Sequence, residues 1–595
     1  MKVHTFFEKN KNCIISILTV LVNVVLMSLL FDFYYDLNDD VMMKDIMAGV
    51  YTGTPDGHNM QTLYILGAFI SLCYRLCRGI PWYGLFLFVC QMGSVYLVGV
   101  RLLCFCKKVK AKAGCMVLLS LFLWGITLPH LLAIQYTITA SVMAAAAIFL
   151  FLTTEKELSP KQFIMQNMPS MVLVVVAFCL RTEMLLLVFP LICLAGLFRW
   201  MEEERFFEKE NFLKYGITIG CILVGMLVSR LLDYTAYGSE EWQRFLVFFD
   251  KRTEIYDYHY EVLTSGEHAE YLASLGLNEA QQELLSNYNF GLDETIDEKL
   301  LAEIAVYAEE NTSDTEVSLS RLVEKGKLYV YRTLHDGDAP YNYIVLAGYL
   351  CVVVMGTGGV LADKKSRGRW RFVWEIVLLG IFRTILWMYV LMMGRDPVRI
   401  THSLYLAEFA VLAGMLYRQC EGWMRKEGKG QKLTFAIATL VMLGFLFGCY
   451  LPHSIMATRA DKTAREEVNK DCLTIAEYCK AHPDNFYFED VYSTVSFSQK
   501  IFEDVDNSLS NYDIMGGWMC KSPLYYDKLE QFGMTTMEEG LLYDENVYFI
   551  MDMTADDTDW MRAYYAGKGI AVSVEQVDKI NDAYAVYQVV EQKEN

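Results

Sequence analysis

The chain has 595 residues, of which 54% are hydrophobic and 21% are charged, and its mean hydropathy is +0.24. This combination excludes an ordinary soluble protein, because it requires long apolar segments separated by strongly polar ones. The net charge of −19 argues against nucleic acid as a partner.

Apolar segments predict an all-α polytopic membrane domain of about 11 transmembrane helices, since a span takes about 20 apolar residues. The segments lie near residues 12–33, 83–103, 113–128, 132–152, 169–181, 184–198, 214–232, 341–361, 372–393, 401–418 and 432–450. The first has no small-residue cleavage site and is predicted to stay as an anchor. Segments 169–181 and 184–198 are alternatively one long helix. The stretch from Thr62 to Leu76 is too short for a span and predicts an interfacial helix.

The distribution of basic residues predicts the orientation of the chain. With the amino terminus in the cytoplasm, the inner connections hold 24 Lys and Arg residues, including the clusters 107–112 and 364–371, and the short outer connections hold six. This is the asymmetry expected of a multi-pass membrane protein. It places residues 34–81, 233–340 and 452–595 on the extracytoplasmic side.

Four regions follow from these spans. Residues 1–232 form an amino-terminal membrane module with an acidic outer loop at 34–81, and residues 233–340 form an extracytoplasmic helical insertion. Residues 341–451 hold the last transmembrane helices. Residues 452–595 alternate helix-like stretches with short β-type runs such as 485–489 and 547–551, which predicts an extracytoplasmic α/β domain. From Ile455 onward this region has 27 acidic and 12 basic residues, so it accounts for most of the net negative charge.

Two adjacent carboxylates, Asp39 and Asp40, lie just beyond the first apolar segment. A single Asp at this position would be explained by capping of a following helix. A second acid beside it exceeds what a cap requires, and a carboxylate at the membrane surface can serve as a general base. The pair is therefore the leading candidate for a catalytic site.

Three short motifs give the chain a resemblance to a known family. They are Asn38-Asp39-Asp40 with the following residues 43–49 and Pro81-Trp82-Tyr83, then Leu180-Arg181-Thr182-Glu183, then Gly394-Arg395-Asp396-Pro397-Val398-Arg399. Their placement in outer connections over the first 450 residues or so resembles the GT-C superfamily of integral-membrane glycosyltransferases, of the bacterial type. The resemblance implies transfer of a hexose or pentose from a polyprenyl-phosphate donor to a cell-surface glycan, glycolipid or polymer, with inversion.

The same resemblance implies roles for individual residues. Asp39 or Asp40 would be the catalytic base, and Arg395, Arg399 or Arg181 would hold the donor phosphate, for which an arginine fork is well suited. Candidates for the substrate groove are His58, Trp82, Tyr83, Glu183, Arg252 and Tyr256. Some relatives use a divalent metal and others do not; no acid cluster here has metal-ligand spacing, so no cofactor is predicted, with a divalent metal left open.

Each candidate also has a structural interpretation. Arg395 and Arg399 could extend to lipid headgroups, and Arg181 with Glu183 could be an ion pair that closes a turn. The aromatic stretch around Arg252 and Tyr256 could be an interfacial anchor. Arg383, in the middle of an apolar segment, is predicted to pair with Glu375 or Glu408 because an unpaired charge there is costly. The Met-Gly-Gly-Trp sequence at 515–518 is read as a turn in the core of the tail domain, with acceptor binding as the alternative.

Other functions fit the same topology. A transporter or flippase for lipid-linked saccharides would share the span count and the buried arginine, although no paired halves are visible in the sequence. A polysaccharide polymerase and a non-catalytic scaffold also fit. The chain departs from the resemblance in two respects: its tail matches no soluble domain of the superfamily by motif, and its second acid is Asp where several relatives have Glu.

Overall fold

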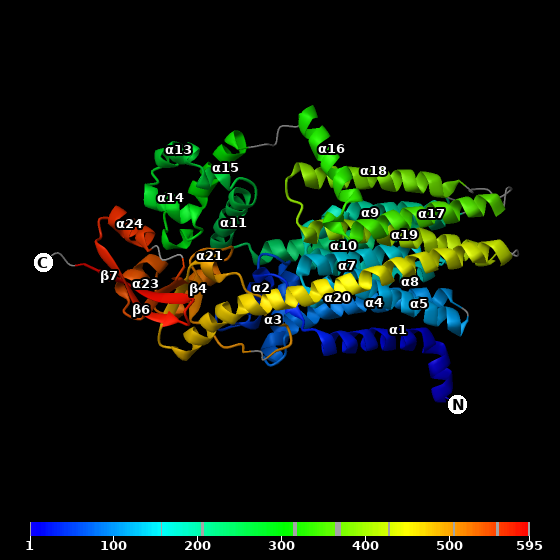
Figure 1. Cartoon of the computed structure of the whole chain (residues 1–595), viewed down its shortest axis with the longest axis horizontal. Helices are drawn as coiled ribbons and strands as arrows, with labels where there is room; N and C mark the ends of the chain where they lie inside the picture. Colours follow the sequence, from blue (N-terminus) through cyan, green and yellow to red (C-terminus); the bar gives the residue numbers. More distant parts are fainter. Residues whose placement is uncertain are drawn as a thin grey trace.

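A computed structural model describes residues 2–106, 108–155, 157–203, 207–312, 318–362, 370–425, 429–503, 506–554 and 558–592. A long helical bundle forms one part of the molecule, and a mixed α/β domain with a helical insertion beside it lies at one end of the bundle (Figure 1). We call that end of the bundle the domain end. Residue 107 and residues 364–369 of the two basic clusters lie outside the described residues.

Within the described part of the chain, ten helical stretches are long and apolar enough to cross a membrane. They are formed by α1 (Lys2–Leu30), α4 (Trp82–Phe105), the continuous run of α5 (Val109–Phe122), a π-helical turn (Leu123–Thr127) and α6 (Leu128–Leu132), α8 (Pro160–Leu180), α9 (Thr182–Trp200), α10 (Lys209–Ala236), α17 (Tyr341–Ala362), α18 (Arg371–Met392), α19 (Val398–Arg425) and α20 (Lys429–Ala481). The prediction of a helical, multi-pass membrane domain is confirmed.

The predicted span at 132–152 is not among these ten. It corresponds to α7 (Tyr136–Leu152), which lies at the centre of the bundle. It has 17 residues, of which 15 are buried, and its alanines at 144–147 let helices approach closely. It packs against α4, α8, α9 and α19. A helix enclosed in this way is covered by protein and does not need the length of a lipid-exposed span.

Segments 169–181 and 184–198 belong to two helices. The backbone of Arg181 is extended, with φ −153° and ψ 96°, so α8 ends and α9 begins at this residue. Arg181 is consequently held at the domain end, in the turn between two membrane helices.

The loop after α1 stays at the domain end and contains two short helices, α2 (Asn38–Ala48) and α3 (Tyr64–Leu76). With 13 residues, α3 is shorter than the spans, which agrees with the prediction that it does not cross the membrane. Strand β1 (Tyr34–Tyr35) pairs in parallel with β2 (Ala133–Ile134), and Tyr34 also forms an antiparallel bridge with Lys500 of the tail. The start of the acidic loop is thereby fixed to both the bundle and the tail.

The tail forms a five-stranded mixed sheet in the order β4-β3-β5-β7-β6, which confirms the predicted α/β domain. Strands β4 (Tyr512–Ile514), β3 (Phe486–Glu489) and β5 (Val547–Asp552) are parallel, whereas β7 (Tyr584–Glu591) runs antiparallel to β5 and β6 (Val572–Ile580). Helices α21 (Val491–Thr494), α22 (Pro523–Gln531), α23 (Met537–Tyr543) and α24 (Asp559–Gly567) complete the domain. Helix α20 continues from the bundle into it, through the predicted boundary at 451/452, as one helix of 53 residues.

The insertion is helical, with α11 (Glu240–Tyr258), α12 (Glu261–Thr264), α13 (Ala269–Ser274), α14 (Glu279–Ser286), α15 (Glu298–Asn311) and α16 (Leu319–Leu334). Helices α11 to α15 share one hydrophobic cluster with the tail domain. Helix α16 instead packs against α18 of the bundle. The insertion thus bridges the tail and the membrane domain.

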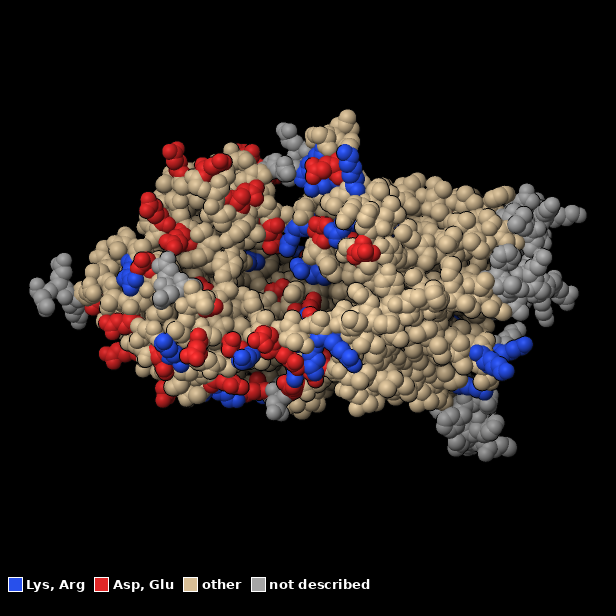
Figure 2. Space-filling model, viewed as in Figure 1, with Lys and Arg blue, Asp and Glu red and all other residues tan. Residues whose placement is uncertain are grey.

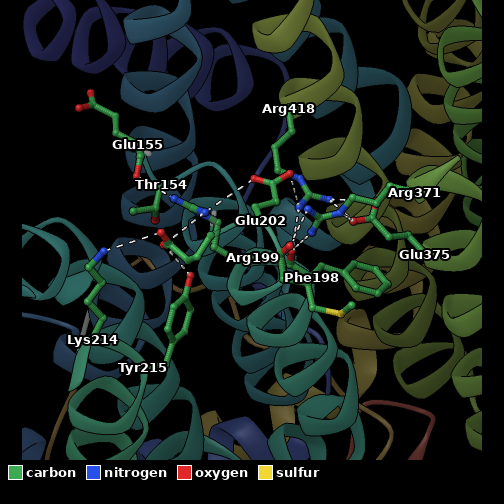
Figure 3. A network of polar contacts seen from close by, with 12 residues as sticks. Thr154, Glu155, Phe198, Arg199, Glu202, Lys214, Tyr215, Arg371, Glu375 and Arg418 are labelled. Carbon is green, nitrogen blue, oxygen red and sulfur yellow. Dashed lines mark hydrogen bonds and ion pairs between the residues drawn. The ribbon is translucent and has the colours of Figure 1, made fainter. Parts of the chain in front are cut away.

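A network of buried charges joins α9, α18 and α19 (Figure 3), at the end of the bundle opposite the tail (Figure 1). Glu375 accepts hydrogen bonds from Arg371 at 2.9 Å and from Arg418 at 3.3 Å, and Arg418 also forms an ion pair with Glu202 at 3.1 Å. Each cation meets a carboxylate, as buried charges require. Glu375 is therefore used by this network and is not the partner of Arg383.

Arg383 pairs with the other predicted partner, Glu408, at 2.9 Å. Its remaining nitrogens donate to the hydroxyls of Tyr329 and Thr333 on α16, both at 2.9 Å. Tyr349 donates to the second oxygen of Glu408 at 2.6 Å. This fully bonded pair connects α16 to α17, α18 and α19.

We expect Arg383→Met to lower the thermal unfolding temperature strongly, because breaking a buried pair from one side leaves a buried unpaired charge and costs about 3–5 kcal/mol. The double variant Arg383→Met with Glu408→Gln removes that charge and should recover at least half of the loss. Heat unfolding in detergent, followed by tryptophan fluorescence, measures both. Ser28→Ala, which removes an exposed hydroxyl bonded only to its own helix, is the control. A double variant as unstable as Arg383→Met would contradict this assignment.

Candidate functional site

The two predicted acids lie in α2, where the bundle meets the tail domain. Figure 2 shows the molecule hollowed between these two parts, with basic and acidic side chains on the walls of the hollow. The residues of α2 divide between the two main hydrophobic clusters of the protein, with Met43 in the cluster of the bundle and Ile46 in the cluster of the tail and insertion. The helix thus forms part of the seam between them.

Asp40 points into the bundle and is fully buried. Its Oδ1 accepts a hydrogen bond from the Tyr83 hydroxyl at 2.7 Å, and its Oδ2 has no hydrogen-bond partner among the described residues. Burial raises the pKa of Asp40 well above its ordinary value, and the nearby charges of Asp39 and Asp36 raise it further. Asp40 is shielded from any substrate and is held in place by the first turn of α4.

Asp39 points toward the seam and is only half-buried. Its Oδ1 accepts a hydrogen bond from the indole nitrogen of Trp518, in the tail domain, at 3.1 Å. Burial raises the pKa of Asp39 above its ordinary value, while the positive charges of Arg399, Arg181 and Arg252 oppose that rise. A carboxylate with a raised pKa that remains partly exposed suits a general base.

Two of the three predicted phosphate ligands, Arg399 and Arg181, act electrostatically on Asp39. Arg399 lies in the first turn of α19, and among the described residues its guanidinium makes no hydrogen bond or ion pair. Arg181 donates to Gln61 at 2.5 Å and forms an ion pair with Glu183 at 3.1 Å. Arg399 therefore has the guanidinium most available to an added anion.

The third predicted phosphate ligand, Arg395, is already engaged. It forms an ion pair with Asp257 at the end of α11, and its guanidinium lies over the ring of Tyr258 at 5.3 Å. These contacts attach the insertion to the connection between α18 and α19. Arg395 would have to give up Asp257 before it could bind a phosphate with the same nitrogen.

Arg252 and Tyr256 come from α11 and face the loop that ends α14. Arg252 is buried, donates to the hydroxyl of Tyr288 and lies over the ring of Phe249 at 5.3 Å. The hydroxyl of Tyr256 donates to the carbonyl of Leu285 at 2.6 Å. Arg252 contributes charge near Asp39, whereas Tyr256 packs inside the insertion.

The remaining groove candidates, His58, Trp82 and Glu183, each have partners close by. His58 contacts Asp56 through Nδ1 at 2.6 Å and stacks on Trp242, with ring centroids 4.8 Å apart. Trp82 donates its indole N–H to the Cys77 carbonyl at 2.8 Å. The Glu183 side chain is 71% exposed and pairs with Arg181, which matches the structural interpretation of this turn as an ion pair.

Several residues at the site have no motif of their own in the sequence. Gln61 accepts hydrogen bonds from both Arg181 and Tyr136, and the Arg181 guanidinium lies over the ring of Tyr136 at 5.2 Å. In the sequence, Trp518 is recognisable only as part of the 515–518 segment, which predicts a turn in the tail, with acceptor binding as the alternative. The separation of 479 residues between Trp518 and Asp39 explains why spacing could not connect them.

Among the described residues, no group of three or more His, Cys, Asp and Glu side chains could hold a metal ion. The chemistry that the side chains themselves can perform at the seam is proton acceptance by Asp39 and stabilisation of negative charge by the arginines.

We expect Asp40→Asn to raise the thermal unfolding temperature by a few °C at pH 8 and to have no such effect at pH 4. A carboxyl with a raised pKa in the folded state binds its proton more tightly when folded. The contribution of Asp40 to the stability of the wild type is therefore fully present below the ordinary pKa of 3.8 and is lost as the pH rises through the raised pKa. Asn does not titrate, and its oxygen can still accept the bond from Tyr83. Thermal unfolding of both proteins across this pH range measures the difference.

The control for this measurement is Asp582→Asn, which alters an exposed carboxyl between β6 and β7. A lower unfolding temperature for Asp40→Asn than for wild type at pH 8 would mean that Asp40 is ionised and stabilising in the folded protein.

The chain has little similarity to known proteins. No family model matches the chain, and no curated protein matches it. Among solved structures it is similar to ArnT from Cupriavidus metallidurans bound to undecaprenyl phosphate, with 12% sequence identity and a TM-score of 0.37 over 96% of this chain and 97% of that one. A similarity of this size assigns the chain to no family.

Proposed function

We propose that the protein is a membrane glycosyltransferase of the GT-C type, which moves a sugar from a polyprenyl-phosphate donor to a glycan, glycolipid or polymer acceptor. The observation that carries the proposal is the environment of Asp39: a half-buried carboxylate that accepts a hydrogen bond from Trp518 and on which the positive charges of arginines from three separate parts of the chain act. Direct displacement at a phosphate-activated sugar needs one base and cations for the leaving group, and it needs no other covalent machinery.

The proposed reaction is a single displacement. Asp39 takes the proton of the acceptor hydroxyl while that oxygen forms a bond to the anomeric carbon. The bond between the anomeric carbon and the phosphate oxygen breaks, and the lipid phosphate leaves with the electron pair. Attack from the side opposite the leaving group inverts the anomeric centre.

The arginines would act on the leaving phosphate. As the glycosidic bond breaks, negative charge grows on the phosphate, and a cation that is already in position stabilises this charge without reorganisation. Arg399 is the leading candidate because its guanidinium has no partner among the described residues, and Arg181, whose charge also acts on Asp39, is the second. Arg395 remains a candidate only in a state in which Asp257 has released it.

The two acids would have separate roles. Asp39 is only half-buried, so we assign it as the base. Asp40 is enclosed and bonded to Tyr83, so we assign it to positioning of α2. The raised pKa of Asp39 supports the base assignment, since a stronger base accepts a proton more readily near neutral pH.

The orientation proposed for this enzyme follows the basic residues of the sequence. The amino terminus would lie in the cytoplasm of a bacterial cell and the tail domain outside, so that transfer takes place at the extracytoplasmic surface of the membrane. A donor lipid would then reach the seam from the outer leaflet.

The test is sugar transfer by purified protein, using labelled polyprenyl-phosphate sugars as donors and native membrane extract as acceptor, with and without a metal chelator. We expect Asp39→Asn to lower kcat/KM by at least about 100-fold, the usual contribution of a general base. Equal transfer by wild type and Asp39→Asn would remove Asp39 from the reaction. Movement of donor lipid across vesicles without transfer would favour a transporter.

The phosphate role is tested separately in the same assay. We expect Arg399→Ala to lower kcat/KM for the donor by about 10- to 100-fold, which is the range for loss of one hydrogen bond to a charged group. The control is Arg562→Ala, an arginine on the tail that pairs with Asp559 of its own helix. A larger loss in Arg395→Ala than in Arg399→Ala would reassign the phosphate ligand.

A further inference from the structure

The tail domain reaches the candidate base through one side chain. Trp518 follows β4, and its indole nitrogen lies 3.1 Å from Oδ1 of Asp39. Among the described residues, Trp518 is the one that packs against both large hydrophobic clusters, that of the bundle and that of the tail and insertion. Its position therefore reports whether the two parts are docked.

The loop before Trp518 is held rigidly from two sides. The Met515 N–H donates to the carbonyl of Glu489 at the end of β3, at 2.9 Å, and the Met515 carbonyl accepts from Gly291 of the insertion at 2.8 Å. A Cβ on Gly516 would lie 1.9 Å from the Tyr288 carbonyl oxygen, so no other residue fits there. The loop can thus deliver the indole to a fixed position.

The segment that clamps the loop also joins the arginines near Asp39. Tyr288 accepts a hydrogen bond from Arg252, one of the cations that act on Asp39. Met515 and Met519, on either side of the glycines and the indole, are buried. The sheet, the insertion and α2 are therefore joined at one point, with the indole N–H directed at a carboxylate.

We propose that Trp518 is a positioning residue for Asp39. Its indole N–H donates a hydrogen bond to Oδ1, which fixes the rotamer of the carboxylate. Oδ2 is then left to receive the proton of the acceptor hydroxyl. This inference rests on the proposed role of Asp39 as the base. It gives the tail domain a function, since the site is complete only when the tail is docked on α2.

The chemistry predicts a specific signature. A hydrogen bond donated to a carboxylate favours its ionised form, so loss of the indole N–H raises the pKa of Asp39. The acidic limb of the pH–rate profile then moves to higher pH. If the indole ring acted only by packing, Trp518→Phe would leave this limb of the profile in place, because Phe keeps an aromatic ring at the position and removes the N–H.

The test compares Trp518→Phe with Trp124→Phe. The control also loses one indole hydrogen bond to a side-chain oxygen, from Trp124 to Asn23 at 2.8 Å, but within the bundle. We expect Trp518→Phe to lower kcat by about 10- to 100-fold, to leave KM for the donor within about twofold and to shift the acidic limb upward. Trp124→Phe should leave the profile unchanged.

A second measurement does not depend on activity. In protein labelled with 15N-tryptophan, which has ten indoles, the resonance missing from Trp518→Phe is that of Trp518. It should shift with pH in wild type and stop shifting in Asp39→Asn. Thermal unfolding of both Phe variants checks that the fold is retained.

The outcomes separate this inference from the proposed function. A titrating Trp518 resonance together with a shifted pH profile supports both. A titrating resonance in a wild-type protein that transfers no sugar supports the contact and overturns the proposed reaction. Transfer that depends on Asp39 but is unchanged in Trp518→Phe overturns the positioning role.

Discussion

The structure depends on holding two adjacent carboxylates away from bulk water at the seam between a membrane bundle and a soluble domain. Removing a carboxylate from water is costly unless hydrogen bonds or cations compensate. Here the compensation comes from distant parts of the chain: Tyr83 for Asp40, and Trp518 with three arginines for Asp39. Any change that separates the two parts of the molecule therefore exposes the site as well.

Helix geometry explains why two identical neighbours differ in environment. Successive residues on an α-helix point about 100° apart, so α2 directs Asp40 toward the bundle when Asp39 faces the seam. Burial raises the pKa of the enclosed Asp40 well above its ordinary value; burial also raises the pKa of the half-buried Asp39, but there the positive charges of three arginines oppose the rise. One short helix thus supplies both an anchor and a candidate base.

The bundle supports this arrangement with charge pairs far from the site. Arg383 and Glu408 connect α16 to three membrane helices, and the network around Glu375 joins α9, α18 and α19 at the opposite end (Figure 3). Helix association in a membrane gains little from the hydrophobic effect, so packing and polar contacts have to fix the helices relative to one another. Two of the arginines that act on Asp39 belong to this bundle, Arg181 between α8 and α9 and Arg399 in the first turn of α19, so their positions depend on how these helices pack.

The sequence by itself determined the class of the protein. Hydropathy and length identified the membrane helices, the failure of α3 to reach the length of a span and the α/β nature of the tail, because these depend on local composition and periodicity. It also singled out Asp39, Asp40 and the arginines of the connections predicted to be extracytoplasmic as candidate site residues. Tertiary structure decided which of them meet: Arg399 and Arg181 act on Asp39, Arg395 pairs with Asp257, and Glu408 rather than Glu375 pairs with Arg383. The contact of Trp518 with Asp39 spans 479 residues, and such contacts follow from packing between domains, which leaves no periodic signal in the chain.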